Sequence, residues 1–400
     1  MLRVGIVAAL SLPALSGCAS FALQENAAAT AEFARTNFGV APTYNDTAEA
    51  RSAAEARARE LLSSPLSADG AVEIALKFSP GFQELLADSA AASAAATQSG
   101  RLPNPIFEWE RLAGGEGLEI DRALRLSLLD LLLLPRRATL ADLQQRQHRL
   151  RSAGDVVRTA TDVRKAWVEA VAAGQSATYA EQVQSAAAAG ASLGRAMAAS
   201  GNFSRLERAR QQAFYADATA ELARARLESA AARERLVRLL GLGPELAERL
   251  QLPERLPDLP ATAPGRDGTA ERAFEDRLDV QLARAELDFT AKSLGLTRVT
   301  STVNLLEVGR LRNSTPEGGT DRGWAVEVAV PVFDFGDARR ANARAIYLAS
   351  LNRAAQVTVE AHSHVRESYL AYRTAFDLAR HYRDEIVPLR KSIADENLLL

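Results

Sequence analysis

IFEWE at residues 106–110 and EIDRALRLSL at residues 119–128 are two short segments in which apolar and charged side chains alternate. Alternation with a period of two predicts β-strands whose two faces meet different environments. The intervening GGEG at residues 114–117 predicts the turn of a hairpin. The apolar face is interrupted once, at Arg122. The sequence therefore predicts a two-stranded hairpin with one apolar and one polar face.

A helical stretch of unusual length follows this hairpin. Residues 136–199 are rich in alanine, the residue with the highest helix propensity, and carry an apolar seam around Trp167. Such a helix would be on the order of 95 Å long, which no compact globular domain needs. Gly201 and Asn202 end it, and a second helix is predicted at residues 204–240. The two helices should form a long hairpin.

The same order of elements then recurs. A helix is predicted around residues 274–289, a strand at 298–308, a turn with glycine and proline at 312–323, and a strand at 324–332. Another long helix should begin near Asp337. The order helix, strand, strand and long helix in each half indicates one architectural unit used twice.

Both halves also share a basic motif where the second strand passes into the long helix. The motif sets two arginines a few residues after an aspartate: Asp130 with Arg136 and Arg137, and Asp334 with Arg339 and Arg340. We expect these arginines to anchor the junction between strands and helices. A plain solvated helix start fits the motif nearly as well.

The first twenty residues resemble the signal of a bacterial lipoprotein. Arg3 precedes the apolar run Val4–Ala14, which is too short to span a bilayer. LSGC at residues 15–18 resembles a lipobox, in which Cys18 is acylated and becomes the first residue of the mature chain. This resemblance, with Ala19 next, implies a lipid anchor in the outer membrane. Beyond residue 20 no apolar run is long enough for a transmembrane helix, so only strands could cross a membrane.

Composition argues against nucleic-acid binding and against enzyme chemistry. The formal net charge of -2 offers no basic field to nucleic acid. Cys18 is the sole cysteine, so no thiol nucleophile other than the lipidation site is present. His362 and His364 are two residues apart on a predicted helix and face different ways, which is poor geometry for a metal. No glycine-rich phosphate loop precedes a helix. We expect no enzyme activity, no metal and no cofactor.

Four strands in one chain cannot close a barrel, and open sheet edges are not tolerated in hydrocarbon. The strands must therefore form a soluble sheet or combine with other copies. Alternation alone favours a half-buried soluble sheet, whereas the lipobox and the doubled arrangement favour a membrane barrel with its apolar face outward. In that barrel Glu119, Asp121, Arg125 and Glu327 would face a wet lumen of mixed charge, which identifies no substrate.

Four further motifs resemble one known family. LSADGAVEIAL at 66–76 is similar to the opening helix of TolC-type outer-membrane efflux proteins, and GRLPNP at 100–105 to the segment before their first strand. GNFSRLE at 201–207 resembles their hairpin tip, and VPVFDFG at 330–336 the end of their fourth strand. Each motif alone is weak. Their order and spacing over residues 66–400 carry the resemblance.

The resemblance implies a mainly α fold with a small β part, assembled as a homotrimer. A twelve-stranded membrane β-barrel would continue into a periplasmic α-helical tunnel. The subunit would be the passive exit duct of a tripartite efflux pump, surrounded by outer-membrane lipid and docked onto a periplasmic adaptor protein and an inner-membrane transporter. At the hairpin tip, Asn202, Arg205 and Glu207 are expected to contact the adaptor. A weak similarity to the channels of metal-cation exporters has no metal-binding cluster to support it.

A lipid-anchored periplasmic adaptor or coiled-coil scaffold without a barrel is the alternative. It would share the lipobox and the hairpin, but it should contain one hairpin flanked by globular β domains. The channel interpretation divides the chain into five parts: a signal peptide at 1–17, an N-terminal tether and helix at 18–65, a first repeat at 66–245, a linker at 246–268 and a second repeat at 269–400.

The second half has no returning helix. The helix from Asp337 runs to Leu400, with a bend expected at Pro388, and no turn follows it. Its apolar seam would then stay uncovered: Val365, Tyr369, Tyr372 and Phe376. We expect the sequence to be a truncated form of a longer channel subunit, with the final helix of its second repeat missing.

Overall fold

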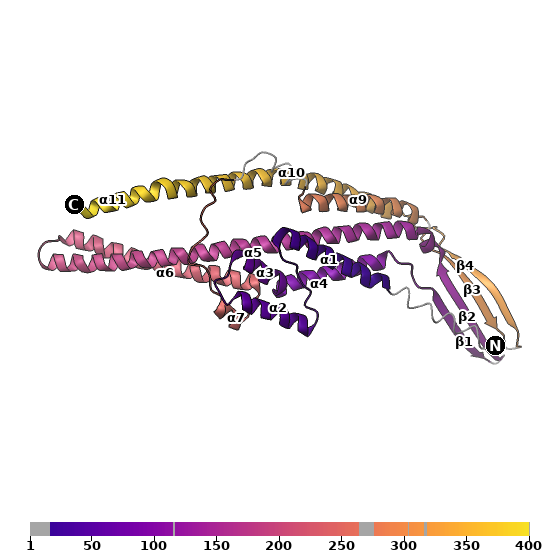
Figure 1. Ribbon diagram of the computed structural model, residues 1–400. Coiled ribbons are helices and arrows are strands. Elements are labelled where there is room, and N and C mark those ends of the chain that lie inside the picture. The colour runs from indigo at the N-terminus through magenta and orange to yellow at the C-terminus, as the bar shows by residue number, and fades with distance from the viewer. Residues whose placement is uncertain (1–16, 115–116, 264–275, 303, 316–317, 400) are drawn as a thin grey trace. The chain divides into compact units, whose positions relative to one another are not determined.

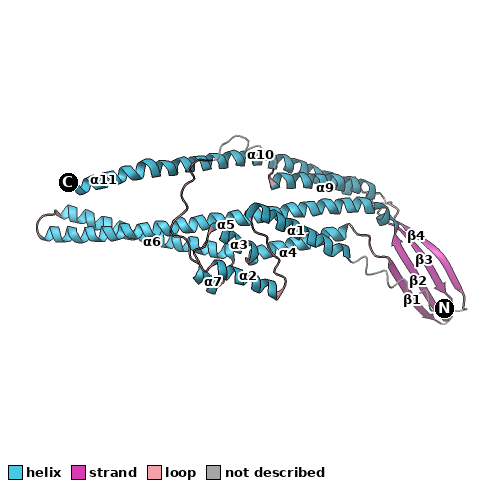
Figure 2. Cartoon of the chain, viewed as in Figure 1, coloured by secondary structure: helices cyan, strands magenta, loops and turns pink. Residues whose placement is uncertain are grey.

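The computed structural model describes residues 17–114, 117–263, 276–302, 304–315 and 318–399. Helices account for most of these residues, and the strands form one sheet (Figure 2). The chain divides into two compact units. Unit 1 comprises Met1–Ala27, Ser89–Arg151 and Pro264–Asp377, and unit 2 comprises Ala28–Asp88, Ser152–Ala263 and Leu378–Leu400. No helix in the described ranges is both long and apolar enough to cross a lipid bilayer.

Unit 1 contains a four-stranded antiparallel sheet in the order β1-β2-β3-β4. The strands are β1 (Ile106–Gly114), β2 (Gly117–Ser127), β3 (Leu306–Ser314) and β4 (Thr320–Val328), and they lie side by side in Figure 1. β2 pairs with β1 and β3, so the two predicted hairpins join into one sheet. β1 and β4 are its edges, and each has one side without a partner strand in the chain.

The third strand lies later in the chain than predicted. Residues 298–300, assigned above to a strand, form the last turn of helix α9 (Leu278–Thr300), and β3 begins only at Leu306. Val303 lies outside the described residues. The prediction was wrong because it followed the β-branched residues before Leu306, while pairing with β2 and β4 selects the more polar segment after it. The turn is correspondingly shorter, between Ser314 and Thr320.

The long helical hairpin is confirmed. Helix α5 (Leu128–Ala199) is followed by α6 (Arg205–Leu240), which ends at Gly241 in the left-handed conformation with φ of 68°. α5 starts earlier than predicted because the Ser127 hydroxyl accepts a hydrogen bond from the Asp130 N–H at 3.2 Å, as a helix cap does. Pro135 lies inside α5 and costs it only one backbone hydrogen bond.

Part of the N-terminal region predicted as a tether is helical. Helix α1 (Gly17–Phe38) occupies it. In unit 1 the Asn26 amide donates hydrogen bonds to Ser93 and Gln145, and the Ser93 side chain is fully buried. The alanine-rich sequence of α1 has high helix propensity, and this buried polar cluster fixes the helix against α4 (Pro80–Ser99) and α5.

Three short helices complete this region: α2 (Ala48–Leu61), α3 (Ala68–Lys77) and α4 (Pro80–Ser99). The Ser67 hydroxyl caps α3, accepting from the Gly70 N–H at 3.0 Å. α3 and α4 are separate helices, and Pro80 is the first residue of α4, where its missing N–H costs nothing.

The core of unit 2 joins α3, α5 and α6 around Trp167. The indole Nε1 donates to the Leu66 carbonyl at 2.7 Å, and the ring is 4% exposed. The predicted linker at 246–268 begins with ordered structure instead. Residues in helix α7 (Pro244–Arg249) and just after it belong to this core, because Leu246 and Leu250 are buried. Other large buried residues of this core include Ile74, Leu76, Val163, Val171, Leu236 and Leu240.

In unit 1, α9 packs on α5: Gln147 donates to the Ala285 carbonyl at 3.1 Å and Arg151 pairs with Glu286 at 2.6 Å. Phe274, predicted to begin this helix, lies outside the described residues.

α10 (Asp337–His381) passes through a π-helical turn at Tyr382–Ile386 into α11 (Val387–Leu399). This distortion stands where a bend was expected, immediately before Pro388. Of the predicted seam, Phe376 is buried, Val365 and Tyr369 are half-buried, and Tyr372 is 41% exposed.

Candidate functional site: a two-faced sheet and a helical hairpin tip

The strand register sorts the charged residues of the sheet onto two faces. Directly paired residues of antiparallel strands share a face, and faces alternate along each strand. One face, called here the acidic face, holds every carboxylate of the four strands and a single arginine, Arg125. Its carboxylates are Glu108, Glu110, Glu119, Asp121, Glu307, Asp321 and Glu327.

All four residues predicted to share a polar face do so. Arg125 bridges two carboxylates, with Glu108 at 3.0 Å and Glu327 at 2.8 Å. Glu119 accepts a hydrogen bond from the Asn313 amide at 2.8 Å. Asp121 pairs in register with Glu110 and Asn313, but neither contact is an ion pair. The residues therefore form one surface rather than one compact cluster.

The acidic face carries more negative charge than the predicted set of residues alone, and its exposure to a lumen stays a prediction. Four further carboxylates belong to it, and no arginine except Arg125 does. The alternation within IFEWE already placed Glu108 and Glu110 opposite the aromatics. Assigning Glu307 and Asp321 to this face required the register of β3. That register did not follow from the sequence, because the third strand was predicted at the wrong residues.

The other face, called here the apolar face, carries large hydrophobic side chains that are solvent-exposed in the single chain. Trp324 and Val326 are 70% and 69% exposed, and Phe107 is 65% exposed. Among the described residues, no helix makes an extended contact with either face of the sheet. A surface of this kind is rare on soluble monomers and marks a protein or membrane contact. Trp109, Leu124 and Val328 belong to the same face and are also exposed.

The two basic motifs make equivalent ion pairs at the helix starts. Arg137 pairs with Asp130 at 2.6 Å and Arg339 with Asp334 at 2.9 Å. Arg340 donates to the Ser301 hydroxyl at 2.9 Å, and Arg136 is exposed. In the second motif the pair joins the start of α10 to Asp334 just before it, whereas Asp130 and Arg137 of the first motif both lie within α5.

Gly336 explains the tight turn before α10. Its φ is 74°, in the left-handed region, and a Cβ there would lie 2.6 Å from the Ser301 Cβ. Only glycine satisfies both conditions. The VPVFDFG motif therefore ends in glycine for a structural reason.

The hairpin tip is exposed and capped. Asn202 and Arg205 are exposed, as a contact site requires. Glu207 has a second role that the sequence prediction missed: its carboxylate accepts from the Ser204 N–H at 2.7 Å, while the Ser204 hydroxyl accepts from the Glu207 N–H at 3.1 Å. This capping box holds the start of α6. The same hydrogen bonds lower the pKa of Glu207, which keeps it ionised. The signal was visible in the sequence as SRLE.

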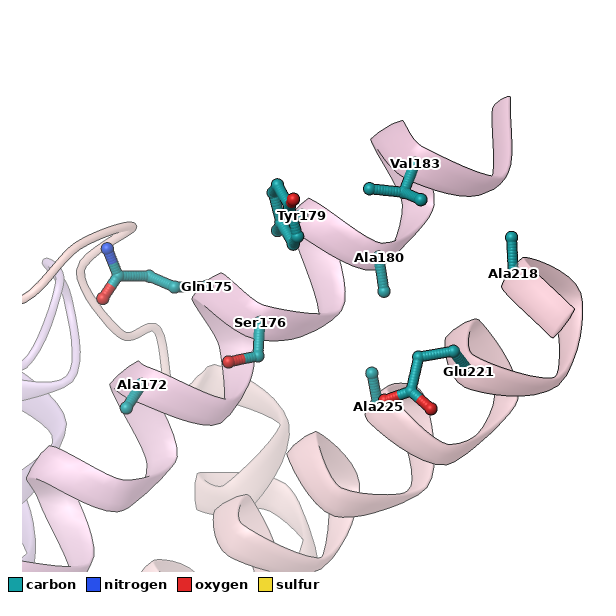
Figure 3. Close-up of a pocket in the computed structure, with 9 residues that line it drawn as sticks. All are labelled: Ala172, Gln175, Ser176, Tyr179, Ala180, Val183, Ala218, Glu221 and Ala225. Carbon is teal, nitrogen blue, oxygen red and sulfur yellow. The ribbon is translucent and has the colours of Figure 1, made fainter. Parts of the chain in front are cut away.

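A shallow groove of about 540 Å³ runs between α5 and α6 (Figure 3). Ala172 and Ala180 from α5 face Ala218 and Ala225 from α6, so the groove reflects small side chains at the helix contact. Glu221 is its one acidic lining residue.

Over the described parts of the chain, no group of three or more histidine, cysteine, aspartate or glutamate side chains could hold a metal ion. His362 and His364 are both exposed on α10. The side chain of Cys18, in the first turn of α1, lies outside the described residues.

Comparison with protein-family models and with curated proteins finds no match. Solved structures do match. The outer membrane protein VceC from Vibrio cholerae is 14% identical, with 83% of this chain and 85% of VceC covered and a TM-score of 0.67. The outer-membrane channel OprN is 18% identical, with 89% and 82% covered and a TM-score of 0.63.

CusC, whose crystal structures concern folding and transmembrane channel formation, is 13% identical, with 83% of this chain and 80% of CusC covered and a TM-score of 0.58. Each of these matches covers more than four fifths of this chain. The chain therefore has the fold of the TolC-type outer-membrane channel proteins.

Proposed function

We propose that this protein is the outer-membrane channel subunit of a tripartite efflux pump. It is a passive exit duct for solutes delivered by an inner-membrane transporter through a periplasmic adaptor protein. The fold shared with outer-membrane channels supports this role. The observation that carries it is the sheet, which has two open edges and an uncovered apolar face.

Three copies of the chain would satisfy both features. The free side of β1 would pair with the free side of β4 in the next copy, giving a closed twelve-stranded barrel without exposed backbone edges. The apolar face would then meet lipid, and the acidic face would line a wet lumen. The helices would continue the duct as a periplasmic tunnel, in which neighbouring copies cover apolar seams such as that of α10.

Conductance and location test this proposal together. The purified protein should fractionate with the outer membrane and produce discrete conductance steps in planar lipid bilayers without any energy source. A strain lacking its gene should accumulate the exported solute. A protein that stays in the periplasm and never conducts would instead support the alternative, a lipid-anchored adaptor or scaffold.

We further propose that Cys18 carries a lipid. Cys18→Ser is expected to leave the N-terminus unprocessed and without an acyl chain, because only a thiol is acylated at this position. Mass spectrometry of the purified protein measures the missing acyl mass. Acyl chains found on the Cys18→Ser variant would contradict the proposed site. Normal outer-membrane levels of an unacylated variant would show that the barrel alone holds the protein there.

The hairpin tip is the proposed adaptor contact. Arg205→Ala should leave the trimer intact and reduce site-specific cross-linking to the adaptor several-fold, since Arg205 is an exposed cation beside the turn. Glu207→Gln preserves the capping box while removing the charge, so it separates contact from capping. Arg224→Ala, an exposed arginine about five turns further along α6, is the control. Equal cross-linking in all three variants would place the contact elsewhere.

A further inference from the structure

The apolar face of the sheet also carries arginines. Of the six arginines in the four strands, five lie on this face, and no carboxylate of the strands does. They are Arg111, Arg122, Arg310, Arg312 and Arg322. The interruption of the apolar pattern at Arg122 is therefore one member of a cluster, called here the arginine row.

The register concentrates this cluster at one level of the sheet. Arg312 pairs directly with Arg122 on one side and with Arg322 on the other. Arg310 lies two residues towards the helical ends of the strands, and Arg111 two residues towards the turns. Nearer the helices the same face is apolar, with Val308 paired between Leu126 and Val326. The face thus changes from aliphatic to cationic along the strands.

In the part of the chain that the structure describes, no carboxylate forms an ion pair with these five arginines. Paired positions of neighbouring strands place side chains about 5 Å apart, so three arginines in line repel one another. The structure gives none of the five an ion pair, although Arg137 and Arg339 at the helical ends have aspartates at 2.6 and 2.9 Å. Arg122 donates a hydrogen bond to the Ser314 hydroxyl at 3.5 Å. An external anion is the simplest means of removing this repulsion.

The surroundings of the row identify the kind of anion. Arg310 stacks over the Trp324 ring at 4.8 Å, and Trp109 pairs in register with Arg122. Tryptophan beside an aliphatic band is typical of the level at which a barrel passes from lipid tails to headgroups. A soluble anionic partner would not need the aliphatic band directly below the charges. A lipid supplies both the tails and the charge.

We propose that the arginine row binds the phosphate groups of membrane lipids in the outer leaflet. This inference rests on the proposed function, which turns the apolar face towards lipid and the strand turns towards the cell exterior. The guanidinium groups bind phosphate oxygens through paired hydrogen bonds, and acyl chains of the same lipid cover the band around Leu126 and Val326. Bound lipid neutralises the repulsion within the row.

Lipid binding by the purified protein in a non-ionic detergent tests the inference. Native mass spectrometry should detect binding of bis-phosphorylated lipid A and much weaker binding of the same lipid after its phosphates are removed. Replacing Arg122, Arg312 and Arg322 together by glutamine should weaken binding of the phosphorylated lipid about 100-fold. The control replaces Arg208, Arg210 and Arg224 of α6 by glutamine, the same change in charge, and should bind as the original protein does.

Thermal stability gives a second readout, because adding lipid should reverse which of two proteins has the higher melting temperature. In lipid-free detergent at low salt, Arg312→Gln should melt at a higher temperature than the original protein, because it removes the central charge of the row. With bis-phosphorylated lipid A present, the original protein should be the more stable of the two. If Arg312 had only a structural role, adding the lipid would not reverse the order of the two melting temperatures.

Three results would overturn the inference: equal affinity for the dephosphorylated lipid, unchanged binding by the triple variant, or displacement of the lipid by millimolar inorganic phosphate. Conductance in planar bilayers is measured on the same samples. If the protein conducts but the triple variant binds lipid normally, the lipid inference alone fails. If no sample conducts, the proposed channel itself is wrong, and the inference falls with it.

Discussion

Val326→Arg is expected to abolish heat-resistant membrane trimers. Val326 lies on the apolar face of β4, paired with Val308 and 69% exposed in the single chain. If this face meets lipid, each subunit would place an arginine in hydrocarbon at a cost of about 2–4 kcal/mol, three times per trimer. Gel electrophoresis of unheated membranes, with quantification of outer-membrane protein, measures the loss.

Ala325→Arg is the matched control, because it introduces the same side chain one residue earlier on the same strand. Ala325 belongs to the acidic face and pairs with Gly309. In a wet lumen the new arginine would be solvated and close to carboxylates, so trimers should persist. If the two variants assemble equally well, the faces are not divided between lipid and water, and the proposed barrel is wrong.

Local signals were sufficient to predict the hairpin of α5 and α6. Ser204 and Glu207 form the capping box that the SRLE sequence indicates, and Gly241 adopts the left-handed conformation that ends α6. The alternation in β1 and β2 likewise placed Glu119, Asp121 and Arg125 on one face. In each case the residues that decide the structure are neighbours in sequence, so a single sequence contains the information.

The third strand depended on distant residues and was missed. LEVGRLRNS at 306–314 does not alternate between apolar and polar residues, and its β structure comes from pairing with β2 and β4. A shift of one residue in register would move every side chain to the other face. The net acidity of one face and the arginine row on the other therefore emerge only from the paired strands.

The acidic face should make the channel strongly cation-selective. Glu110, Asp121 and Asp321 fall on one line across the sheet, with Asn313 between the two aspartates. In a trimer this line would close into a ring of carboxylates, the arrangement by which pores favour cations. Arg125 is the only opposing charge, and it is already shared between Glu108 and Glu327. We therefore expect the duct to serve cationic solutes better than anionic ones.

Reversal potentials in planar bilayers under a salt gradient measure this preference. Replacing Glu110 by Gln, and Asp121 and Asp321 by Asn, should lower the cation-to-anion permeability ratio about tenfold while leaving trimers intact. Arg125→Gln should change the ratio in the opposite direction, because it removes the one positive charge of the face. Both effects should shrink in molar salt, where screening acts over about 3 Å. If the triple variant and Arg125→Gln leave the ratio unchanged, the acidic face does not line the conducting path.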